Sequence, residues 1–360
     1  MLQALRLLLW PFSLLYSLLM TVRNRLFDAG WLPATAFPLP VISVGNLTVG
    51  GTGKTPLTEL LLQLLSGSYR CATLSRGYGR ATKGLRLAKE EDTALSIGDE
   101  PRQLQLKFPR LQVAVAEKRV EGMQALLRLP HPPQVVVLDD AFQHRYVKAG
   151  LSILVVDYHR PLWKDFCLPA GNLRESFAGR KRADLVVVNK CPPKLSEQEA
   201  EEIRKKLSLT PKQTLFFASM SYLSPRPLGD KATEALLEDR LPPPGEELIV
   251  LAGIARPEPF FRQMEAYGRP LRKLVFPDHH AFSAKDVEQL RKALKSDNTG
   301  RSIIVTTEKD AVRLAAVPEM DSDLLSRIWY QPIRLQILFD QQKTFENLIL
   351  SYVEQNQGNG

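Results

Sequence analysis

Short runs of aliphatic and β-branched residues alternate along the chain with longer segments in which apolar residues recur at helical spacing. From about residue 40 to about residue 220 these runs are VISV, CATLS, LQVAVA, QVVVLDD, LSILVVD, DLVVVN and TLFFASM. Continuous apolar runs are typical of strands buried on both faces, and their alternation with helices is typical of a parallel sheet covered by helices. The pattern therefore predicts an α/β domain over residues 29–221.

A second α/β pattern follows a break in this alternation. Residues 222–247 are rich in proline and charge, which favours a connection between domains. The runs LIVLAGIA, LRKLVF, SIIVTT and IRLQILFD then predict further strands, and residues 341–356 predict a closing helix. We therefore expect a smaller C-terminal α/β domain over residues 248–360.

The first 28 residues have a different pattern. No charged residue occurs from Leu7 to Val22, a stretch that as a helix reaches only about 24 Å, less than the ~30 Å hydrocarbon core of a bilayer. Large apolar residues cover most of this helix, and its polar residues fall on one narrow stripe: Gln3, Arg6, Ser13, Ser17, Thr21 and Asn24. The pattern predicts an amphipathic helix over residues 1–28 that lies in a membrane interface. The alternative is a helix whose apolar face docks on the protein core.

Composition narrows the classes of function. The formal charge of +9 favours anionic partners such as nucleotides and acidic lipid surfaces. The sequence contains no recognisable nucleic-acid-binding module, and its three scattered cysteines argue against a disulfide framework and against a zinc site. We therefore expect a protein of the reducing cytosol, with no nucleic-acid partner and no obligate protein partner.

The segment TVGGTGKTP, residues 48–56, lies between a predicted strand and a predicted helix. Glycines let successive backbone N–H groups turn toward an anion, a lysine neutralises the β- and γ-phosphates, and a hydroxyl reaches Mg²⁺. We therefore expect a nucleotide phosphate loop formed by Thr48, Val49, Gly50, Gly51, Thr52, Gly53, Lys54 and Thr55. Thr48 replaces the first glycine of the strict motif, and the loop alone does not separate kinases from switch ATPases or GTPases.

The run VVVLDD ends in two aspartates, Asp139 and Asp140. A carboxylate at the C-terminal end of a buried strand beside a phosphate loop binds Mg²⁺ directly or through water. Asp139 is therefore the expected metal ligand, with a turn or helix cap as the alternative. GTP is disfavoured, because Asn189-Lys190 begins like the guanine-reading NKxD motif but Pro192 stands in place of its aspartate.

Three further polar clusters are unusual. SIGDEP contains Asp99, LDDAFQHR contains His144, and FPDHHAF contains His279. Taken singly, each has an ordinary explanation, such as a helix cap for the aspartate and a core or surface position for the histidines.

Taken together, the motifs resemble those of the tetraacyldisaccharide 4'-kinase family of lipid A biosynthesis. The ordered set is GNLTVGGTGKTP, SRGYGR, GDEP, LDDAFQHR, LPAGNLRE, FPDHH and TTEKDAVRL behind an apolar N-terminal helix, and it spans residues 1 to about 315. Two positions depart from the pattern of the family, Ala141 in place of glycine and Asn172 in place of proline. Both departures leave the polar residues of the motifs intact.

The resemblance implies an enzyme that transfers the γ-phosphoryl group of ATP to the 4'-hydroxyl of a tetraacylated glucosamine disaccharide 1-phosphate and so forms lipid IVA. It implies ATP as donor, Mg²⁺ as cofactor, and a peripheral or monotopic position at the cytoplasmic face of the bacterial inner membrane. The acylated disaccharide and the membrane surface are the implied partners. The alternatives are a membrane-associated switch ATPase of the partitioning or delivery type, which would also carry an amphipathic helix and a phosphate loop, and a nucleotide-dependent scaffold.

The resemblance also implies a catalytic pair. The family's pair corresponds to Asp99 and His279, which would act beside Lys54 of the phosphate loop. A carboxylate or a carboxylate–imidazole pair can take the proton of a sugar hydroxyl as the new bond forms. The sequence leaves open which of the two residues is the base.

Further residues are expected around the phosphates. Mg²⁺ is expected at Thr55 and Asp139, with Glu175 of LPAGNLRE as a further candidate. Stabilisation of the γ-phosphate is expected from Arg76 and Arg119, with a surface salt bridge as the alternative for each. Asp140 and His144 are additional candidates for contacts with phosphate or substrate.

Overall fold

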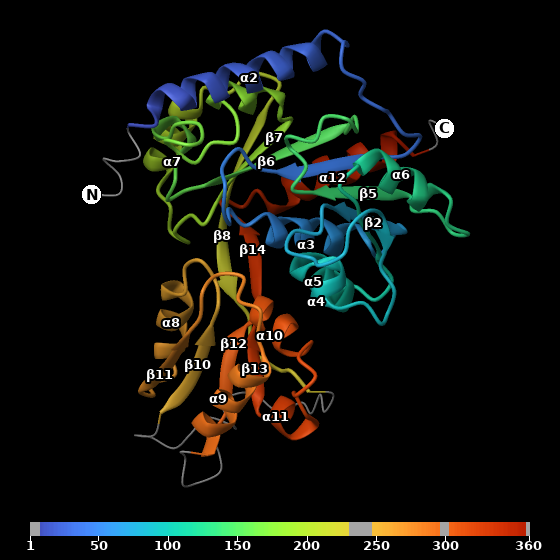
Figure 1. The fold of residues 1–360 in the computed structure, drawn as a ribbon. Helices are drawn as coiled ribbons and strands as arrows, with labels where there is room; N and C mark the ends of the chain where they lie inside the picture. Colours follow the sequence, from blue (N-terminus) through green and yellow to red (C-terminus); the bar gives the residue numbers. More distant parts are fainter. Residues whose placement is uncertain (1–7, 230–246, 296–301, 358–360) are drawn as a thin grey trace.

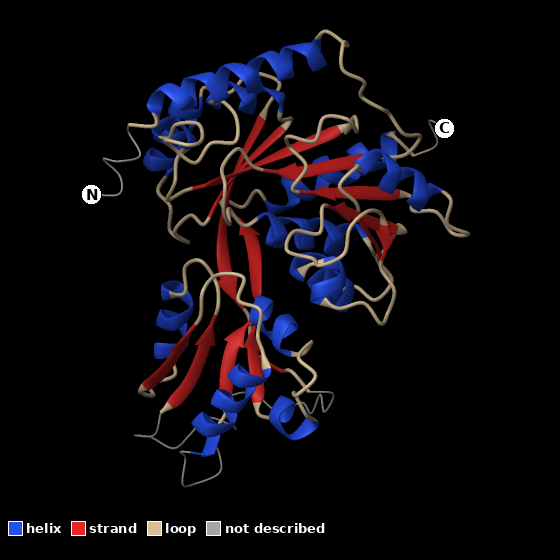
Figure 2. Cartoon of the chain, viewed as in Figure 1, coloured by secondary structure: helices blue, strands red, loops and turns tan. Residues whose placement is uncertain are grey.

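Two α/β units make up the chain (Figure 1), and the computed structural model describes residues 8–229, 247–295 and 302–357. A nine-stranded sheet organises the larger unit in the order β14-β8-β7-β6-β1-β5-β2-β4-β3. A five-stranded sheet organises the smaller unit in the order β11-β10-β12-β13-β9. Helices cover both sheets (Figure 2), so the expected α/β class, with a large, mostly parallel sheet and a second smaller sheet, is confirmed.

Buried strands form the centre of the larger sheet and coincide with the runs that the sequence predicts. They are β1 (Val41–Gly45), β2 (Cys71–Ser75), β4 (Gln112–Val115), β5 (Val135–Asp139), β6 (Leu151–Asp157), β7 (Leu185–Asn189) and β8 (Thr214–Tyr222). Neighbours among these strands pair in parallel, and the short β3 (Arg86–Leu87) adds an antiparallel edge. The carboxyl ends of β1, β5, β6 and β7 therefore meet at one edge, where ligands bind in open α/β sheets.

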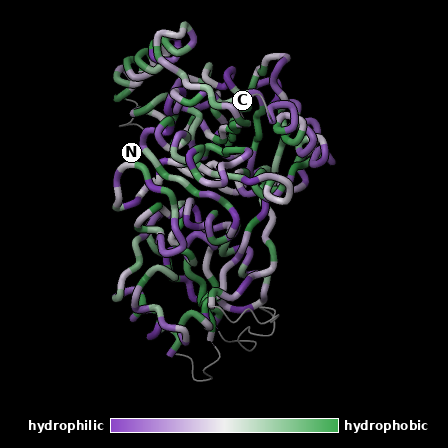
Figure 3. The backbone as a smooth tube through the Cα atoms, turned by 90° about the vertical axis from the view of Figure 1, so that its right-hand side faces the viewer, coloured by the Kyte–Doolittle hydropathy of each residue, from purple (hydrophilic) through white to green (hydrophobic). Residues whose placement is uncertain are grey.

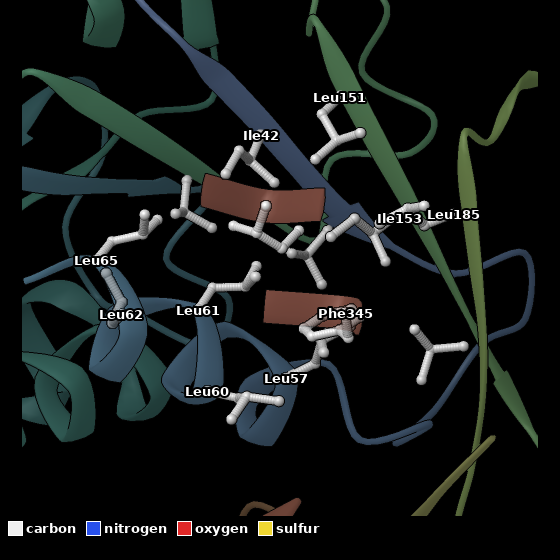
Figure 4. Close-up of a cluster of buried hydrophobic side chains, with 14 of the residues drawn as sticks. Ile42, Leu57, Leu60, Leu61, Leu62, Leu65, Leu151, Ile153, Leu185 and Phe345 are labelled. Carbon is white, nitrogen blue, oxygen red and sulfur yellow. The ribbon is translucent and has the colours of Figure 1, made fainter. Parts of the chain in front are cut away.

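Helices bury their apolar faces on both sides of this sheet. One side carries α3 (Lys54–Leu65), α12 (Gln342–Gln355) and part of α5 (Asp99–Lys107), and the other carries α6 (Arg119–Leu127) and α7 (Glu197–Leu207). The first side is drawn in Figure 4, where Leu57 and Leu61 of α3 and Phe345 of α12 pack toward Ile42 and Ile153 of the sheet. Leucines spaced by four residues share one helical face, which fixes the start of α3 against the end of β1. The remaining short elements of this unit are α4 (Ala94–Ile97), η1 (Leu162–Lys164) and η2 (Phe177–Arg182).

The smaller unit is also a mostly parallel sheet with helices on both faces. Its strands are β9 (Arg226–Pro227), β10 (Leu248–Ala252), β11 (Leu271–Val275), β12 (Ile304–Thr307) and β13 (Ile328–Gln331). All pair in parallel except β9, which is antiparallel to β13. One face is covered by α8 (Glu258–Glu265), and the other by α9 (Ala284–Lys295), α10 (Glu308–Leu314) and α11 (Ser322–Ser326).

The end of the chain returns to the larger sheet. β14 (Ile333–Ile337) pairs antiparallel with β8, and α12 packs into the core of the larger unit. The expected smaller domain over residues 248–360 is thereby corrected at its C-terminal end, because the apolar run of β14 specifies a strand without specifying its partner. Figure 1 shows β8 and β14 running side by side between the two units. Most of the expected connector, residues 230–246, lies outside the described residues.

The helix α2 (Trp10–Asp28) lies across the larger unit on the side away from the smaller unit (Figures 1 and 3). Gly30, with a φ of 75°, ends it in the left-handed conformation that favours glycine. The polar stripe faces the protein: the N–H of Ala170 donates to Oγ of Ser13 at 2.8 Å, and Asn24 donates to Oε2 of Glu175 at 2.7 Å. Two residues of the stripe, Gln3 and Arg6, lie outside the described residues.

Most of the large apolar residues of α2 face away from the protein, whereas Phe27 near its C-terminal end is buried. Between 51% and 60% of the surface of Leu14, Leu15, Leu18 and Leu19 is exposed. The helix is therefore not docked on the protein by its apolar face. Its polar face contacts the larger unit, and most of its apolar face is exposed. Among the described helices, none is long and apolar enough to cross a membrane.

Candidate active site

The phosphate loop, residues 48–55, joins β1 to α3. Gly50 and Gly53 both have a φ of 88°, a conformation that glycine adopts without strain. Side chains at the end of β7 hold the carbonyl oxygens of the loop: Asn189 donates to the oxygen of Thr52 at 3.1 Å, and Lys190 donates to the oxygen of Gly51 at 2.5 Å. With these carbonyl groups bound from outside, the N–H groups of the loop are free to face an anion.

The start of the loop is fixed by pairing with the LPAGNLRE segment. The N–H of Val49 donates to the carbonyl oxygen of Asn172 at 2.8 Å, and Thr48 forms an isolated β-bridge with Leu173. Thr48 and Asn172, two departures from the expected motifs, thus lie next to each other in the fold. The backbone pairing that joins them does not depend on either side chain, so both substitutions are tolerated.

Lys54 lies close to the two aspartates at the C-terminal end of β5. Nζ of Lys54 is 3.6 Å from Oδ1 of Asp140, and the hydroxyl of Thr58 donates to the buried Asp139 at 3.3 Å. Burial and the nearby carboxylate of Glu100 raise the pKa of Asp139 to about 7, against the opposing charge of Lys54. A buried carboxylate whose pKa is raised in this way lacks a compensating cation.

Glu100, to which the sequence analysis assigned no role, connects the loop to the smaller unit. Thr55 donates a hydrogen bond to its carboxylate, and Nζ of Lys309 in α10 lies 2.7 Å from Oε1. Burial opposes ionisation of Glu100, but the charges of Lys309 and Lys54 outweigh it and hold the pKa at about 2. Carboxylate and hydroxyl oxygens thus surround the end of the loop, which is the chemistry that Mg²⁺ prefers.

The oxygen ligands that the protein offers at the loop would bind Mg²⁺ only together with the phosphates of a nucleotide. Within the described residues no group of three or more His, Cys, Asp or Glu side chains is arranged to hold a metal ion. Mg²⁺ at phosphate loops keeps few protein ligands and takes the rest from phosphates and water. Thr55 and Asp139, both buried at the loop, match this requirement.

Asp99 and His279 come from different units and meet at the first turn of α5. Nδ1 of His279 lies 3.0 Å from Oδ2 of Asp99, and Arg313 of α10 donates to the same oxygen from Nε at 2.8 Å and from Nη2 at 2.5 Å. Burial raises the pKa of Asp99, but the hydrogen bond with His279 and the charge of Arg313 outweigh burial and hold it at about 2. His279 has a φ of 57°, an unusual conformation outside glycine that recurs at functional sites.

Arginine side chains also interact with the two aspartates. Arg174 donates to both carboxylate oxygens of Asp140, at 2.9 and 3.0 Å. Arg119 is only 3% exposed, and burial lowers its pKa to about 10. Its Nε has no hydrogen-bond partner among the described residues, so Arg119 is not a surface salt bridge. Arg76 is exposed after β2, near enough for its charge to lower the pKa of Arg119.

His144 lies beside Arg119 and is neutral at pH 7. Burial and the charge of Arg119 lower the pKa of His144 to about 4. Its ring packs edge-on against Tyr146 with 5.6 Å between ring centroids. His144 thus adds a polar but uncharged group near Arg119.

The carboxylate of Glu175, a further candidate metal ligand, is bonded by side chains other than those of Thr55 and Asp139. Each of its carboxylate oxygens accepts a hydrogen bond from Arg182 at 2.8 Å, and the remaining positions are used by Asn24 and Gln143. Consecutive residues of an extended segment point in opposite directions, so Arg174 contacts the site and Glu175 points toward α2. Glu175 therefore anchors the N-terminal helix.

Three basic residues of the site were not predicted from the sequence: Arg174, Lys309 and Arg313. Lys309 and Arg313 are four residues apart in TTEKDAVRL, so they share one face of α10. A basic helical face of this kind complements the acidic GDEP motif. This complementarity is the feature of the sequence that could have indicated their contact.

Known proteins resemble the chain over nearly its whole length. The profile of the family described as Tetraacyldisaccharide-1-P 4'-kinase matches residues 5–354. The tetraacyldisaccharide 4'-kinase of Bacteroides fragilis strain YCH46 is 46% identical over 354 residues, covering 98% of this chain and 94% of that protein. The corresponding protein of Flavobacterium johnsoniae is 47% identical over 353 residues, covering 98% of each chain. A crystal structure of LpxK from Aquifex aeolicus in complex with ATP has a TM-score of 0.74 and 29% identity, covering 97% of this chain and 99% of that chain.

Proposed function

The chain belongs to the tetraacyldisaccharide-1-P 4'-kinase family and is a kinase of lipid A biosynthesis, and we propose that the site between the phosphate loop and α10 carries out its phosphoryl transfer. The observation that carries the proposal is the meeting of Asp99 and His279 at 3.0 Å across the two units, beside the loop that presents Lys54. The donor is ATP, and the acceptor is the 4'-hydroxyl of an acylated glucosamine disaccharide 1-phosphate.

The phosphate loop binds and orients the triphosphate. The N–H groups of residues 50–53 face the β- and γ-phosphates, and the ammonium of Lys54 neutralises charge on them. Thr55 and Asp139 would hold Mg²⁺, which neutralises phosphate oxygens when it is bound. Asp140 keeps Lys54 and Arg174 in place through its two ion pairs.

Phosphoryl transfer requires a proton acceptor opposite the loop. The 4'-oxygen forms a bond to the γ-phosphorus, the bond from that phosphorus to the β–γ bridging oxygen breaks, and ADP leaves. The hydroxyl proton passes to the Asp99–His279 pair, which contributes roughly 10²–10⁴-fold to the rate. Arg119, with its free Nε, stabilises the charge on the γ-phosphoryl oxygens.

The orientation of α2 supports a lipid substrate. Its apolar face enters the interfacial region of a bilayer, while its polar stripe stays bound to the larger unit. The acyl chains of the substrate can therefore remain in the membrane while the sugar reaches the site. We place the enzyme peripherally at the cytoplasmic face of the bacterial inner membrane, where ATP is present. A partitioning or delivery ATPase does not require an acid–base pair opposite its phosphate loop, which favours transfer to an acceptor.

Thin-layer chromatography of γ-labelled ATP, incubated with the enzyme and with or without the disaccharide lipid, tests the proposal. We expect label in the lipid product with the wild-type enzyme, and loss of that label with Lys54→Ala at unchanged melting temperature. Release of labelled phosphate at the same rate without the lipid acceptor would instead support a switch ATPase.

A further inference from the structure

Arg313 links two carboxylates and an imidazole. Its Nε and Nη2 donate to Oδ2 of Asp99, while its Nη1 donates to Oδ1 of Asp310 at 2.9 Å and to the carbonyl oxygen of Gly253 at 3.0 Å. Nη2 also lies 3.2 Å from Nδ1 of His279. The side chain is 5% exposed, so a guanidinium buried in the smaller unit fixes a carboxylate of the larger unit.

Asp310 in turn fixes Arg313. Its side chain is fully buried, and Oδ2 accepts hydrogen bonds from the N–H of Gly253 at 2.9 Å and from the hydroxyl of Thr307 at 2.7 Å. A planar guanidinium with all three nitrogens engaged has a single orientation. The chain from Asp310 through Arg313 to Asp99 is therefore rigid up to the imidazole of His279, which is 40% exposed.

We propose that Arg313 is a positioning residue for the transfer: it fixes Asp99 so that His279 keeps its proton on Nδ1 and presents an unprotonated Nε2 to the sugar hydroxyl. This inference rests on the proposed function of the Asp99–His279 pair, and it adds Arg313 as the residue that orients that pair.

The distances around Nδ1 support this tautomer. Nδ1 can donate to Oδ2 of Asp99 at 3.0 Å or accept from Nη2 of Arg313 at 3.2 Å. Nη2 lies closer to Asp99, at 2.5 Å, and directs a hydrogen there, so the carboxylate is the better partner for the imidazole. With the proton on Nδ1, the lone pair is on Nε2, as in the serine-protease triad where an aspartate sets the tautomer of the general base.

The remaining charged groups around the pair are compatible with this assignment. The charge of Lys309, like that of Arg313, lowers the pKa of Asp99, although Lys309 does so from a longer distance. Oδ1 of Asp278 lies 3.9 Å from Nε2 of His279, which is beyond a hydrogen bond and leaves Nε2 available. The ring of Tyr78 packs edge-on against His279 at 5.6 Å and limits rotation of the imidazole.

The proposal explains why the pair is divided between units. Asp99 belongs to the larger unit, whereas His279 and Arg313 belong to the smaller one. The base is therefore assembled only where α10 docks on α5, through Arg313–Asp99 and the neighbouring ion pairs Lys309–Glu100 and Lys107–Glu308.

Kinetics and nitrogen NMR of the full-length enzyme in detergent test the proposal. The chain has only five histidines, so ¹⁵N-histidine spectra can be assigned with His279→Gln. At about pH 8 we expect the Nδ1–H tautomer of His279 in the wild type. Arg313→Gln should convert it to a mixture of tautomers and lower kcat at least tenfold, with the KM for ATP within threefold.

Two further variants complete the test. Arg313→Lys keeps the charge but cannot reach Asp99, Asp310 and Gly253 together, so it should recover only part of kcat; it decides the question if Arg313→Gln does not fold. Glu308→Gln removes another ion pair between α10 and α5 without contacting Asp99, and it should leave the tautomer unchanged and kcat within threefold. If both Arg313 variants keep the wild-type tautomer and behave like Glu308→Gln while His279→Ala is inactive, Arg313 is only an interdomain tie. If His279→Ala is fully active, the proposed function of the pair fails instead.

Discussion

Nδ1 of His279 lies 3.0 Å from Oδ2 of Asp99, although the two residues are 180 positions apart and belong to different units of the fold. When two groups serve the same proton transfer, removing either one removes most of their joint contribution to the rate. We therefore expect Asp99→Ala and His279→Ala each to lower kcat by about 10²–10⁴-fold, and the double variant to be little worse than the poorer single variant. Steady-state kinetics at saturating ATP measure this, and full additivity would assign the residues separate roles.

His280 provides a matched control for this prediction. It follows His279 in the same loop, but its Nε2 lies 3.1 Å from Oδ2 of Asp286 at the start of α9. His280→Ala should therefore leave kcat within about threefold and cost only about 1 kcal/mol of stability, as expected for one lost hydrogen bond.

Gly53 is the position in the phosphate loop that least tolerates a side chain. It has a φ of 88°, and an added Cβ would lie 2.0 Å from Nδ2 of Asn189. Gly53→Ala should destabilise the nucleotide-free protein by about 1–3 kcal/mol and abolish ATP binding, because the loop must separate from Asn189. Gly51, whose added Cβ meets nothing within 4 Å, is the control: Gly51→Ala should leave the melting temperature unchanged. Equal melting temperatures for the two variants would contradict the bracing role of Asn189.

The parallel strands and the phosphate loop could be predicted because local sequence specifies them. A strand buried on both faces is a continuous apolar run, and the loop follows from its glycines and lysine. The partner of β14 could not be predicted, because an alternating pattern specifies which face of a strand is buried and not which sheet buries it.

The site could be predicted only in part, because local sequence does not specify which elements contact each other across the two units. Asp139 lies at the end of a predicted strand beside the predicted loop, so its position follows from the order of the elements. Arg313 and Lys309 reach the site only because α10 docks on α5, a contact between units that no periodicity encodes. Glu175 and Arg174 are equally polar neighbours in one motif, and only the direction of the extended backbone separates their roles.

The exposed face of α2 predicts how the protein associates with membranes. Leu15 and Leu19 are 56% and 60% exposed, and burying one such side chain contributes about 1.5–3 kcal/mol. Leu15→Glu together with Leu19→Glu should therefore weaken co-flotation with lipid vesicles at least 100-fold and leave ATP binding unchanged. Leu348→Glu, on α12 and 39% exposed, is the control and should float like the wild type. Undiminished flotation of the double variant would exclude α2 as the membrane contact.

Deletion of residues 1–25 is a less specific test of the same contact. Besides the apolar face, it removes Asn24, which donates to Glu175 at 2.7 Å. We expect the truncated protein to lose flotation and also some stability, because one position of a buried carboxylate is left unpaired.

The raised pKa of Asp139 predicts a trade-off between stability and activity. Its folded value of about 7 lies above the ordinary value of 3.8, so between these values the folded protein binds a proton that the unfolded chain does not. The stabilising contribution of that proton is fully present below the ordinary pKa and is lost as pH rises through about 7. Asp139→Asn is uncharged at every pH. It should therefore raise the melting temperature of the nucleotide-free protein at pH 8 by roughly 2 °C or more, raise it less at pH 5, and lower phosphoryl transfer at least 100-fold.

Asp157, a buried aspartate at the end of the neighbouring strand β6, should behave in the opposite way. Burial raises its pKa, but Lys190, at 2.9 Å, outweighs burial and holds the pKa below its ordinary value. Its ionised form is therefore stabilising at pH 8, and Asp157→Asn should lower the melting temperature there. Thermal unfolding from pH 5 to pH 8, in EDTA and without nucleotide, compares the two variants with the wild type. A parallel pH dependence of Asp139→Asn and wild type would mean that Asp139 is already ionised in the folded protein, and that Lys54 alone compensates its charge.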